Sequence, residues 1–453
     1  MERKQFLTAT AAASAGAIAG FGLERAERGT VVSPQAAGDI PGETIGETNC
    51  EIINKKVLER YRKKYRDDLF RSFLPGMDSY VVDHTYGGFL CDLDIRTGKR
   101  NSTTKRAWYE GRGIWLYSFL YNNIERDPHF LEIAGRSKEF ILKHRPADGS
   151  FWASSYSREG EPLSGPGDIF GNLYIAEGLA EYAKASGEDE YLEIARQITL
   201  DSMSSYDQPD YQYHSPSASG ISGPRLLNHW MVFLFLATRI LEQEKTHEIE
   251  QIAGRCVNAL MENHMNPAYG LLNDVLNHDM SLPGNSDLQT ASVGLGIQAL
   301  WMVMYEAVRR QDRTLFRRSA DAFRRHVRVA EDPVYGGYLR SLSHVEKNKW
   351  TLDKSLGVQE EVLIGILLLV EHTGNRGDMK RFLKTDAYVR ETFRRPGYKF
   401  WIAGGDRTVS RYRTSRAEHY HHPRHLMMNL LAVERMIERG GKPSGFLAED
   451  THG

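Results

Sequence analysis

The sequence has only three cysteines, Cys50, Cys91 and Cys256, and none of them stands in the Cys-x-x-Cys spacing of a zinc or redox site. Scattered in this way, they allow one disulfide at most and exclude a disulfide framework. Net charge is also lacking, because 58 Lys and Arg residues face 59 Asp and Glu residues. No overall field therefore attracts nucleic acid or an anionic membrane, and we expect a neutral or locally recognised ligand and no nucleic-acid partner.

The first 28 residues differ in character from the rest of the chain. A basic start, with Arg3 and Lys4, is followed by small and apolar residues from Phe6 to Leu23 and then by charges. This layout is typical of a secretory signal, and "RKQFL" resembles a twin-arginine export signal with Lys4 in place of the second arginine. We expect residues 1–28 to be an export signal, with an extracytoplasmic mature chain and no membrane span in it; a frayed helix would instead leave the protein cytoplasmic.

Residues 29–50 are rich in Gly, Pro, Thr and Glu and are interpreted as a linker. From about residue 55 onward, stretches with apolar residues at helical spacing recur in pairs, each pair joined by a short polar break. The first stretch of each pair is apolar nearly all round and the second is amphipathic, as expected of an inner and an outer helix. The pattern predicts an all-α domain at 51–442 built from six helical hairpins, followed by a C-terminal tail at 443–453.

The connections between the predicted hairpins are long and contain glycine and aromatic residues, as in "YGGFLCDLDIRTG" and "YGGYLRSLSHVEKNKW". Each alternates like a short strand and ends in a turn, which predicts small antiparallel ribbons at one mouth of the helical domain. Loops of this length usually carry function. Polar residues near the ends of the inner helices are therefore candidates for a site.

Three segments carry a resemblance to a known family: "YGGFLCDLDIRTGKRNSTTKRAWYEGRGIWLYSFLYN", "TLDKSLGVQEEVLIGILLLVEHTGN" and "EHYHHPRHLMMNL". With them the chain resembles the N-acylglucosamine 2-epimerase family, which includes cellobiose 2-epimerases and ketose-aldose isomerases. The resemblance extends over most of residues 55–440. It implies an (α/α)6 barrel and a sugar 2-epimerase or aldose-ketose isomerase acting on a hexose, an N-acylated hexose or an oligosaccharide. We expect neither a cofactor nor a metal.

The resemblance also assigns roles to residues of this sequence. Arg112 matches the arginine that polarises the sugar carbonyl oxygen, and His421 matches one of two proton-transferring histidines. Moving a proton beside a carbonyl requires a base of near-neutral pKa and a cation at the oxygen, so these residue types suit the chemistry. Glu361 matches a glutamate that positions a partner, and we predict it as the third catalytic residue. The predicted substrate-binding residues are Trp108, Glu110, His229, His278, Gln359 and Arg424.

One departure from the family pattern affects the mechanism. The family's second histidine lies in a Pro-Gly-His-x-x-Glu stretch that opens an inner helix, whereas the matching region here is "SVGLGIQALWMVM". Leu295 stands in the histidine position and Gln298 in the glutamate position. We therefore expect another group to replace the second histidine, and His229, His278 and Glu110 are the candidates.

Alternative interpretations remain open at the level of sequence. His419, His421 and His425 could hold a transition metal, or could pack and hydrogen-bond at the start of a helix. The same barrel supports paired-carboxylate glycoside hydrolysis or a lyase reaction, for which Glu110 and Asp274 are the candidates. A carbohydrate-binding protein without catalysis is the third class. The oligomeric state, including a homodimer, is left open.

Overall fold

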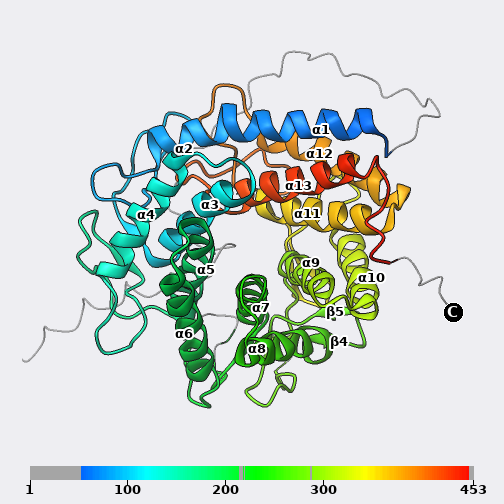
Figure 1. Cartoon of the computed structure of the whole chain (residues 1–453). Helices are drawn as coiled ribbons and strands as arrows, with labels where there is room; N and C mark the ends of the chain where they lie inside the picture. The colour runs from blue at the N-terminus through cyan, green and yellow to red at the C-terminus, as the bar shows by residue number, and fades with distance from the viewer. Residues whose placement is uncertain (1–52, 214–217, 219, 286–287, 448–453) are drawn as a thin grey trace, which may run out of the picture.

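Six helices form an inner ring in which each lies beside the next, and α13 meets α3 to close it (Figure 1). The computed structural model describes residues 53–213, 218, 220–285 and 288–447, so the predicted signal and linker lie outside the described residues. The inner helices are α3 (Ala107–Asn123), α5 (Ile169–Ser186), α7 (Leu227–Leu241), α9 (Val293–Arg310), α11 (Leu356–Thr373) and α13 (His421–Glu438).

An outer layer of helices covers the inner ring (Figure 1). It consists of α1 (Lys55–Asp68), α4 (Pro128–Lys143), α6 (Asp189–Tyr206), α8 (His247–Asn258), α10 (Arg313–Ala330) and α12 (Arg376–Phe393). A π-helical turn at Leu69–Phe73 joins α1 to the short α2 (Leu74–Tyr80), and another at Ala259–Asn263 extends α8. Because α1 packs against α13, the first and last long helices complete the sixth hairpin. The predicted all-α (α/α)6 barrel is confirmed.

The two layers follow from the hydrophobic pattern of their helices. Every residue of α11 from Leu356 to His372 is buried, because the outer layer covers one side of it and the barrel interior the other. In α10 the buried residues recur at intervals of three and four, so this helix buries one face only. Among the described residues no helix is long and apolar enough to cross a membrane.

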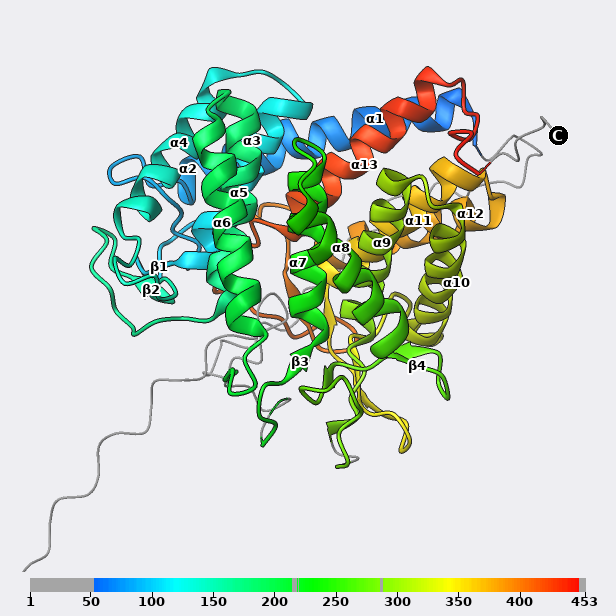
Figure 2. The same cartoon turned by 60° about the horizontal axis from the view of Figure 1, so that its bottom comes forward.

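Short antiparallel strand pairs gather at one end of the helices, as the sequence predicts (Figure 2). The pairs are β1 (Lys105–Arg106) with β2 (Ser155–Tyr156), β3 (Arg225–Leu226) with β6 (Val275–Leu276), β4 (Met265–Asn266) with β5 (Leu271–Leu272), β7 (Ser341–His344) with β8 (Lys349–Thr351), and β9 (Lys354–Ser355) with β10 (Gly404–Gly405). Three inner helices, α3, α7 and α11, begin directly after β1, β3 and β9. The strand pairs therefore hold the starts of these inner helices at one mouth.

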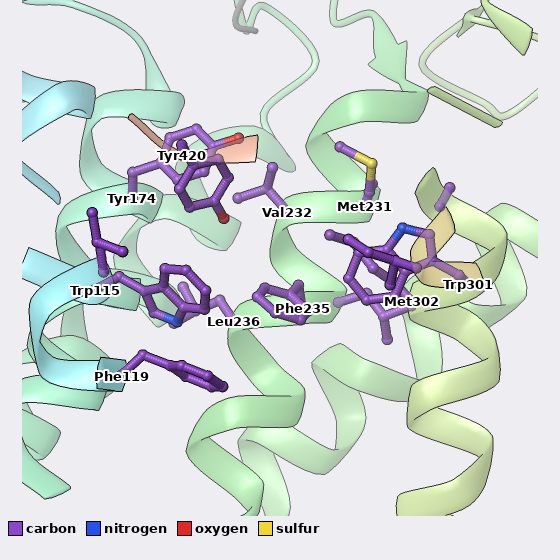
Figure 3. Packing of buried hydrophobic residues seen from close by; sticks show 14 of the residues in the cluster. Trp115, Phe119, Tyr174, Met231, Val232, Phe235, Leu236, Trp301, Met302 and Tyr420 are labelled. Atoms are coloured by element: carbon purple, nitrogen blue, oxygen red, sulfur yellow. The ribbon is translucent and has the colours of Figure 1, made fainter. Parts of the chain in front are cut away.

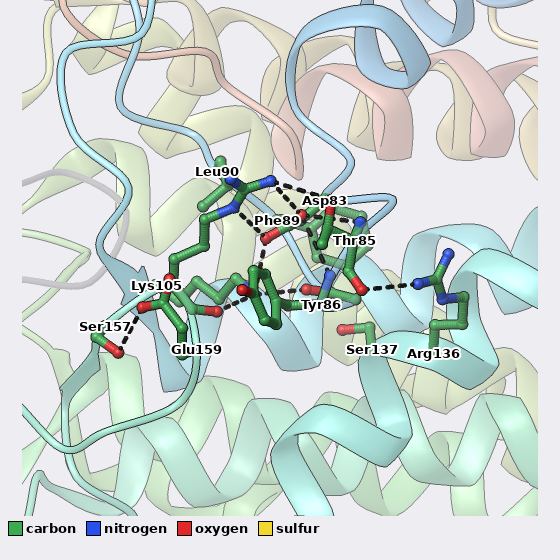
Figure 4. Close-up of polar contacts among 12 residues, drawn as sticks. Asp83, Thr85, Tyr86, Phe89, Leu90, Lys105, Arg136, Ser137, Ser157 and Glu159 are labelled. Carbon is green, nitrogen blue, oxygen red and sulfur yellow. Dashed lines mark hydrogen bonds and ion pairs between the residues drawn. The ribbon is translucent and has the colours of Figure 1, made fainter.

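A buried lysine fixes the loop in front of α3. Lys105 is fully buried, with its Nζ 2.6 Å from the Gly87 carbonyl oxygen and 3.2 Å from the Asp83 carboxylate (Figure 4). Arg158 adds two hydrogen bonds to the same carboxylate, at 2.8 and 2.9 Å. Burial alone would raise the pKa of Asp83, but these two cations lower it well below its ordinary value. An ion-pair network thus holds the loop in addition to its isolated β-bridges and backbone hydrogen bonds.

The same arrangement recurs in front of α11. Lys354 contacts the Gly336 carbonyl oxygen and lies 3.0 Å from Asp332, which Arg407 also binds through two hydrogen bonds of 2.8 Å. Each of these residues follows its counterpart at the first loop by 249 positions, so the two loops form an internal repeat. Both inner helices therefore start from equivalently fixed loops.

Two glycines bring α3 and α5 into close contact. A Cβ added to Gly111 would lie 2.3 Å from the backbone of Tyr174, and one added to Gly178 would lie 2.5 Å from the Gly111 carbonyl oxygen. The close approach places Arg112, the residue after Gly111, beside the Tyr174 ring. Side chains from α3, α5, α7, α9 and from Tyr420 just before α13 then meet in the middle of the barrel (Figure 3).

Candidate active site

The first residue of α13, His421, is bound to a carboxylate on α11. Its Nδ1 lies 2.8 Å from Oε1 of Glu361, and Arg424, one turn further along α13, donates to the same oxygen. The second oxygen of Glu361 accepts a 2.7 Å hydrogen bond from the indole N–H of Trp301 on α9. All four side chains are buried, so three inner helices contribute to one desolvated polar group.

The charge of this group is set by its contacts. Burial alone would raise the pKa of Glu361, but the Arg424 charge and the hydrogen bonds from His421 and Trp301 lower it below its ordinary value. An ionised Glu361 stabilises the N–H on Nδ1 of His421 and so selects the tautomer in which Nε2 exchanges protons. Glu361 therefore orients a general base, as a carboxylate does in other histidine-dependent enzymes.

Arg112 is a cation surrounded by aromatic rings. Its guanidinium carbon lies 4.1 Å from the ring centroid of Tyr174, 4.4 Å from that of Tyr420 and 4.6 Å from that of Trp108. One Nη donates a 2.7 Å hydrogen bond to the Tyr174 hydroxyl, and the side chain is 3% exposed. Among the described residues no carboxylate forms an ion pair with Arg112, and its Nε lacks a hydrogen-bond partner. The aromatic faces stabilise the cation but leave it available for an anionic oxygen.

Tyr420 connects this cation to the His421 group. The centroid of its ring lies 4.4 Å from the Arg112 guanidinium carbon and 4.6 Å from that of Arg424, and the His421 ring centroid is 5.5 Å away. The Tyr420 hydroxyl donates a 2.8 Å hydrogen bond to Glu177 on α5. Burial raises the pKa of Glu177 to about 7, although Tyr420 and the two arginines favour its ionised form. The site thus contains two groups that can bind a proton, the His421 imidazole and the Glu177 carboxyl group, and Tyr420 contacts both of them.

A comparison with known protein families gives a match to the N-acylglucosamine 2-epimerase (GlcNAc 2-epimerase) model over residues 87–423. The chain belongs to the N-acylglucosamine 2-epimerase family. It is 24% identical to the N-acylglucosamine 2-epimerase of Mus musculus over 360 residues, which cover 77% of this chain and 85% of the mouse protein. The expected sugar epimerase or isomerase class is confirmed at the level of the family.

Solved structures show the same fold. Cellobiose 2-epimerase from Bacillus thermoamylovorans superposes with a TM-score of 0.72 at 14% identity, over 83% of this chain and all of that chain. A D-mannose isomerase superposes with a TM-score of 0.69 at 13% identity, over 86% of this chain and all of that chain. At these identities the likeness concerns the barrel fold alone.

The structure brings five of the predicted site residues together: Trp108, Arg112, Glu361, His421 and Arg424. Two others bind the loops that precede their helices. Glu110 accepts hydrogen bonds from the Phe89 N–H at 3.1 Å and the Ser137 hydroxyl at 2.9 Å, while Gln359 is bonded to both the N–H and the carbonyl of Tyr338. Glu110 and Gln359 are equivalent positions of the internal repeat, and their observed contacts fasten loops.

The two spare histidines lie in different surroundings. His229, on the first turn of α7, is enclosed by the rings of Phe170, Tyr206 and Tyr213, with centroids 4.5 to 5.2 Å away. Neither of its ring nitrogens has a hydrogen-bond partner among the described residues, and burial lowers its pKa to about 3. His278 is exposed and accepts a 2.6 Å hydrogen bond from Arg225. Their roles as replacement bases stay predictions.

Leu295 and Gln298 lie in α9, and Asp274 is bonded to the residues that begin this helix. Leu295 is half-buried in the first turn, and the buried Gln298 has a side-chain oxygen without a partner among the described residues. Asp274 accepts hydrogen bonds from the Ser292 N–H at 2.7 Å and from the Thr290 hydroxyl at 2.8 Å. Asp274 therefore stabilises the beginning of α9, and these contacts do not pair it with Glu110.

The other histidines of the segment before α13 face different partners. His419 contacts the Tyr109 carbonyl at 3.1 Å, whereas His421 binds Glu361, so the metal set considered from the sequence does not assemble. Among the described residues one other group of ligand type forms, from Glu360, His422 and His425. The 2.5 Å separation of Glu360 Oε1 and His422 Nδ1 is that of a hydrogen bond, since two ligands of a tetrahedral ion with bonds of about 2 Å lie more than about 3 Å apart.

Sequence reasoning did not identify Glu177, Tyr420 or Trp301 as site residues. "IFGNLYIAEGLAEYAKA" has the pattern of an inner helix, in which a glutamate could equally be a paired core group. A signal was present, because Glu177 follows Tyr174 by three positions and so lies on the same face of α5. What could not be seen is that this face meets Tyr420.

Proposed function

We propose that the protein interconverts reducing sugars by moving the proton on the carbon next to the carbonyl, with His421 as a general base and Arg112 at the carbonyl oxygen. One observation carries the proposal. The Tyr420 ring contacts Arg112, a buried cation with no carboxylate partner among the described residues, and also His421, whose imidazole the Glu361 carboxylate orients. The first can stabilise negative charge on oxygen, and the second can accept a proton.

The reaction begins with the open-chain sugar bound so that its carbonyl oxygen meets Arg112. His421 Nε2 takes the proton from C2, and the electron pair of the broken C–H bond forms the C1=C2 double bond of an enediolate. The negative charge on O1 is then held by the guanidinium, which is more effective in a desolvated site than in water. Glu361 stabilises the imidazolium that results, because the carboxylate is ionised and hydrogen-bonded to Nδ1.

The site favours this chemistry over glycoside hydrolysis. Hydrolysis requires two carboxyl groups on either side of a glycosidic bond. Both oxygens of Glu110 accept hydrogen bonds from the Phe89 N–H and Ser137, and both oxygens of Asp274 bind the residues that start α9. A proton-transfer reaction instead uses the residues that the barrel brings together.

Hydrogen exchange tests the proposal directly. The protein is incubated in D₂O with N-acetylglucosamine, cellobiose, mannose and other reducing hexoses, and loss of the C2 proton signal is followed by NMR. We expect exchange and a new epimer or ketose with at least one sugar. Release of reducing ends from glycosides would support a hydrolase, and saturable binding without exchange would support a binding protein. Sedimentation of the same sample tests whether the protein forms a homodimer.

A further inference from the structure

Inverting the configuration at a carbon requires two proton-transferring groups when the enediolate keeps its orientation, because the proton leaves from one face and arrives at the other. His421 supplies one of them. On α9, Leu295 occupies the position at which a second histidine was expected, and its side chain carries no proton. Another group in contact with the site must therefore serve the opposite face if the reaction is an epimerisation.

Glu177, like Glu110, is a buried glutamate of an inner helix without a lysine or arginine partner among the described residues. Its side chain is 1% exposed, yet among the described residues it forms no ion pair. Glu361, Glu306 and Glu371, by contrast, are each bound to at least one arginine. The partner of Glu177 is the Tyr420 hydroxyl, at 2.8 and 3.2 Å from its two oxygens. A hydrogen bond from the Tyr420 phenol, and not an ion pair with a cation, therefore holds the Glu177 carboxyl group in the barrel interior.

Tyr420 is placed to reach a substrate that Arg112 binds. The Arg112 and Arg424 guanidinium groups lie 4.4 and 4.6 Å from its ring centroid. Burial and the nearby Glu177 raise the pKa of the Tyr420 phenol well above its ordinary value, and the two cations offset this only in part, so the hydroxyl holds its proton until it is transferred. Figure 3 shows the Tyr420 ring beside that of Tyr174, on the inner face of the barrel. Tyr420 also precedes His421 directly, so the phenol and the imidazole meet the site from one short segment.

We propose that Tyr420 is the second proton-transferring residue and that Glu177 is a positioning residue that orients the phenol and returns its proton. The inference rests on the proposed function and specifies it as an epimerisation at C2. After His421 has taken the C2 proton, the Tyr420 O–H bond breaks and its proton is added to C2 from the other face. The electrons of the C1=C2 bond form the new C–H bond, the carbonyl is restored, and the phenolate takes the carboxyl proton of Glu177. Exchange of His421 and Glu177 with water completes the cycle.

The charge state of Glu177 agrees with this role. Burial raises the pKa of this carboxyl group to about 7, so near neutral pH it is divided between the form that gives a proton and the form that receives one. A carboxyl group of ordinary pKa would be almost fully ionised at pH 7 and would seldom return a proton to a phenolate.

The test compares Tyr420→Phe, Glu177→Gln and His421→Asn with the parent protein in D₂O, starting from each epimer of the best sugar in turn. We expect Tyr420→Phe to lower interconversion by at least about 10², while C2 exchange from one epimer stays within about tenfold. His421→Asn should show the converse, keeping exchange from the other epimer only. Glu177→Gln should lower kcat by at least about tenfold with KM nearly unchanged, because the amide oxygen still accepts the Tyr420 bond but the side chain carries no acidic proton.

Glu181→Gln is the matched control, since Glu181 lies one turn further along α5, is buried and is bonded to Asn122 at 2.8 Å. It should keep the parent rate. The inference is overturned if Tyr420→Phe and Glu177→Gln interconvert the epimers at the parent rate, if Tyr420→Phe loses exchange from both epimers equally, or if the parent makes only a ketose with direct transfer from C2 to C1. Absence of any exchange by the parent protein would instead overturn the proposed function itself.

Discussion

Replacing Glu110 with glutamine should stabilise the protein at alkaline pH and not at acidic pH. Glu110 is fully buried on α3, and burial raises the pKa of its carboxyl group to about 7, although Lys105 and two hydrogen bonds favour ionisation. The ordinary value is 4.5, so the folded state holds its proton more tightly than the unfolded state. A raised folded-state pKa gives stability that is complete below about pH 4.5 and is lost as the pH rises through about 7.

The size of the effect follows from this difference. A separation of about 2.5 pKa units corresponds to about 3 kcal/mol at roughly 1.4 kcal/mol per unit. Glutamine does not ionise, and its oxygen can still accept the Phe89 N–H bond, as the oxygen of Gln359 accepts the Tyr338 N–H bond at the equivalent position. The free energy of unfolding of Glu110→Gln minus that of the parent should therefore increase by about 2–3 kcal/mol between pH 4.5 and pH 8.5.

Urea unfolding at the two pH values measures this change. Gln359→Glu is the reverse control, because it places a carboxyl group at the equivalent position of α11 and should destabilise the protein at pH 8.5 more than at pH 4.5. A difference between Glu110→Gln and the parent that is the same at both pH values would refute the reasoning. It would mean that the carboxyl group of Glu110 is not held in its protonated form by burial.

Three further outcomes are expected. Glu361→Gln should lower sugar turnover by at least about 10² in steady-state assays, because it removes the charge that orients His421 and compensates Arg424; unchanged turnover would contradict this. Asp332→Asn should lower the free energy of unfolding by about 3–5 kcal/mol in urea titrations, since the fully buried Lys354 loses its counter-charge, whereas removing the exposed Lys63 charge should change it by less than about 1 kcal/mol. Mass spectrometry of protein from the native host should find residues 1 to about 28 removed, and an intact Met1 in the cytoplasm would contradict the export prediction.

The fold was predictable because the two helix types of the barrel have different hydrophobic patterns. α11 is buried over almost its whole length and α10 on one face only, and this difference is visible in their sequences. The short ribbons were also predictable from alternating residues and glycine turns. The pairing of the first and last helices could be predicted from the number of hairpins alone. An unpaired helix remains at each end of the chain, and the two must pack together to close the ring.

The roles of the polar residues near the helix starts were harder to predict. Glu110 and Arg112 are two residues apart, as are Gln359 and Glu361, and on a helix such side chains point in nearly opposite directions. Arg112 and Glu361 accordingly contact residues of other inner helices, while Glu110 and Gln359 bind the loops. Helical geometry alone could have separated the members of each pair.

The contact between Tyr420 and Glu177 could not be predicted, because it depends on how the segment before α13 packs against α5 inside the barrel. The two residues are 243 positions apart, and neither belongs to a spacing that predicts their meeting. A tyrosine beside a histidine-rich segment and a glutamate within an apolar helix are each common in protein cores. Only their contact inside the barrel distinguishes Tyr420 and Glu177 from ordinary core residues.

The most direct test of the proposed mechanism is the rate at which His421→Asn and His419→Asn interconvert the true sugar and its product. Both histidines are buried in the same segment, but His421 binds the Glu361 carboxylate and His419 binds a backbone carbonyl. We predict that His421→Asn loses at least about 10² of the interconversion rate while His419→Asn stays within about tenfold of the parent. Full activity of a folded His421→Asn protein would contradict the assignment of His421 as the general base.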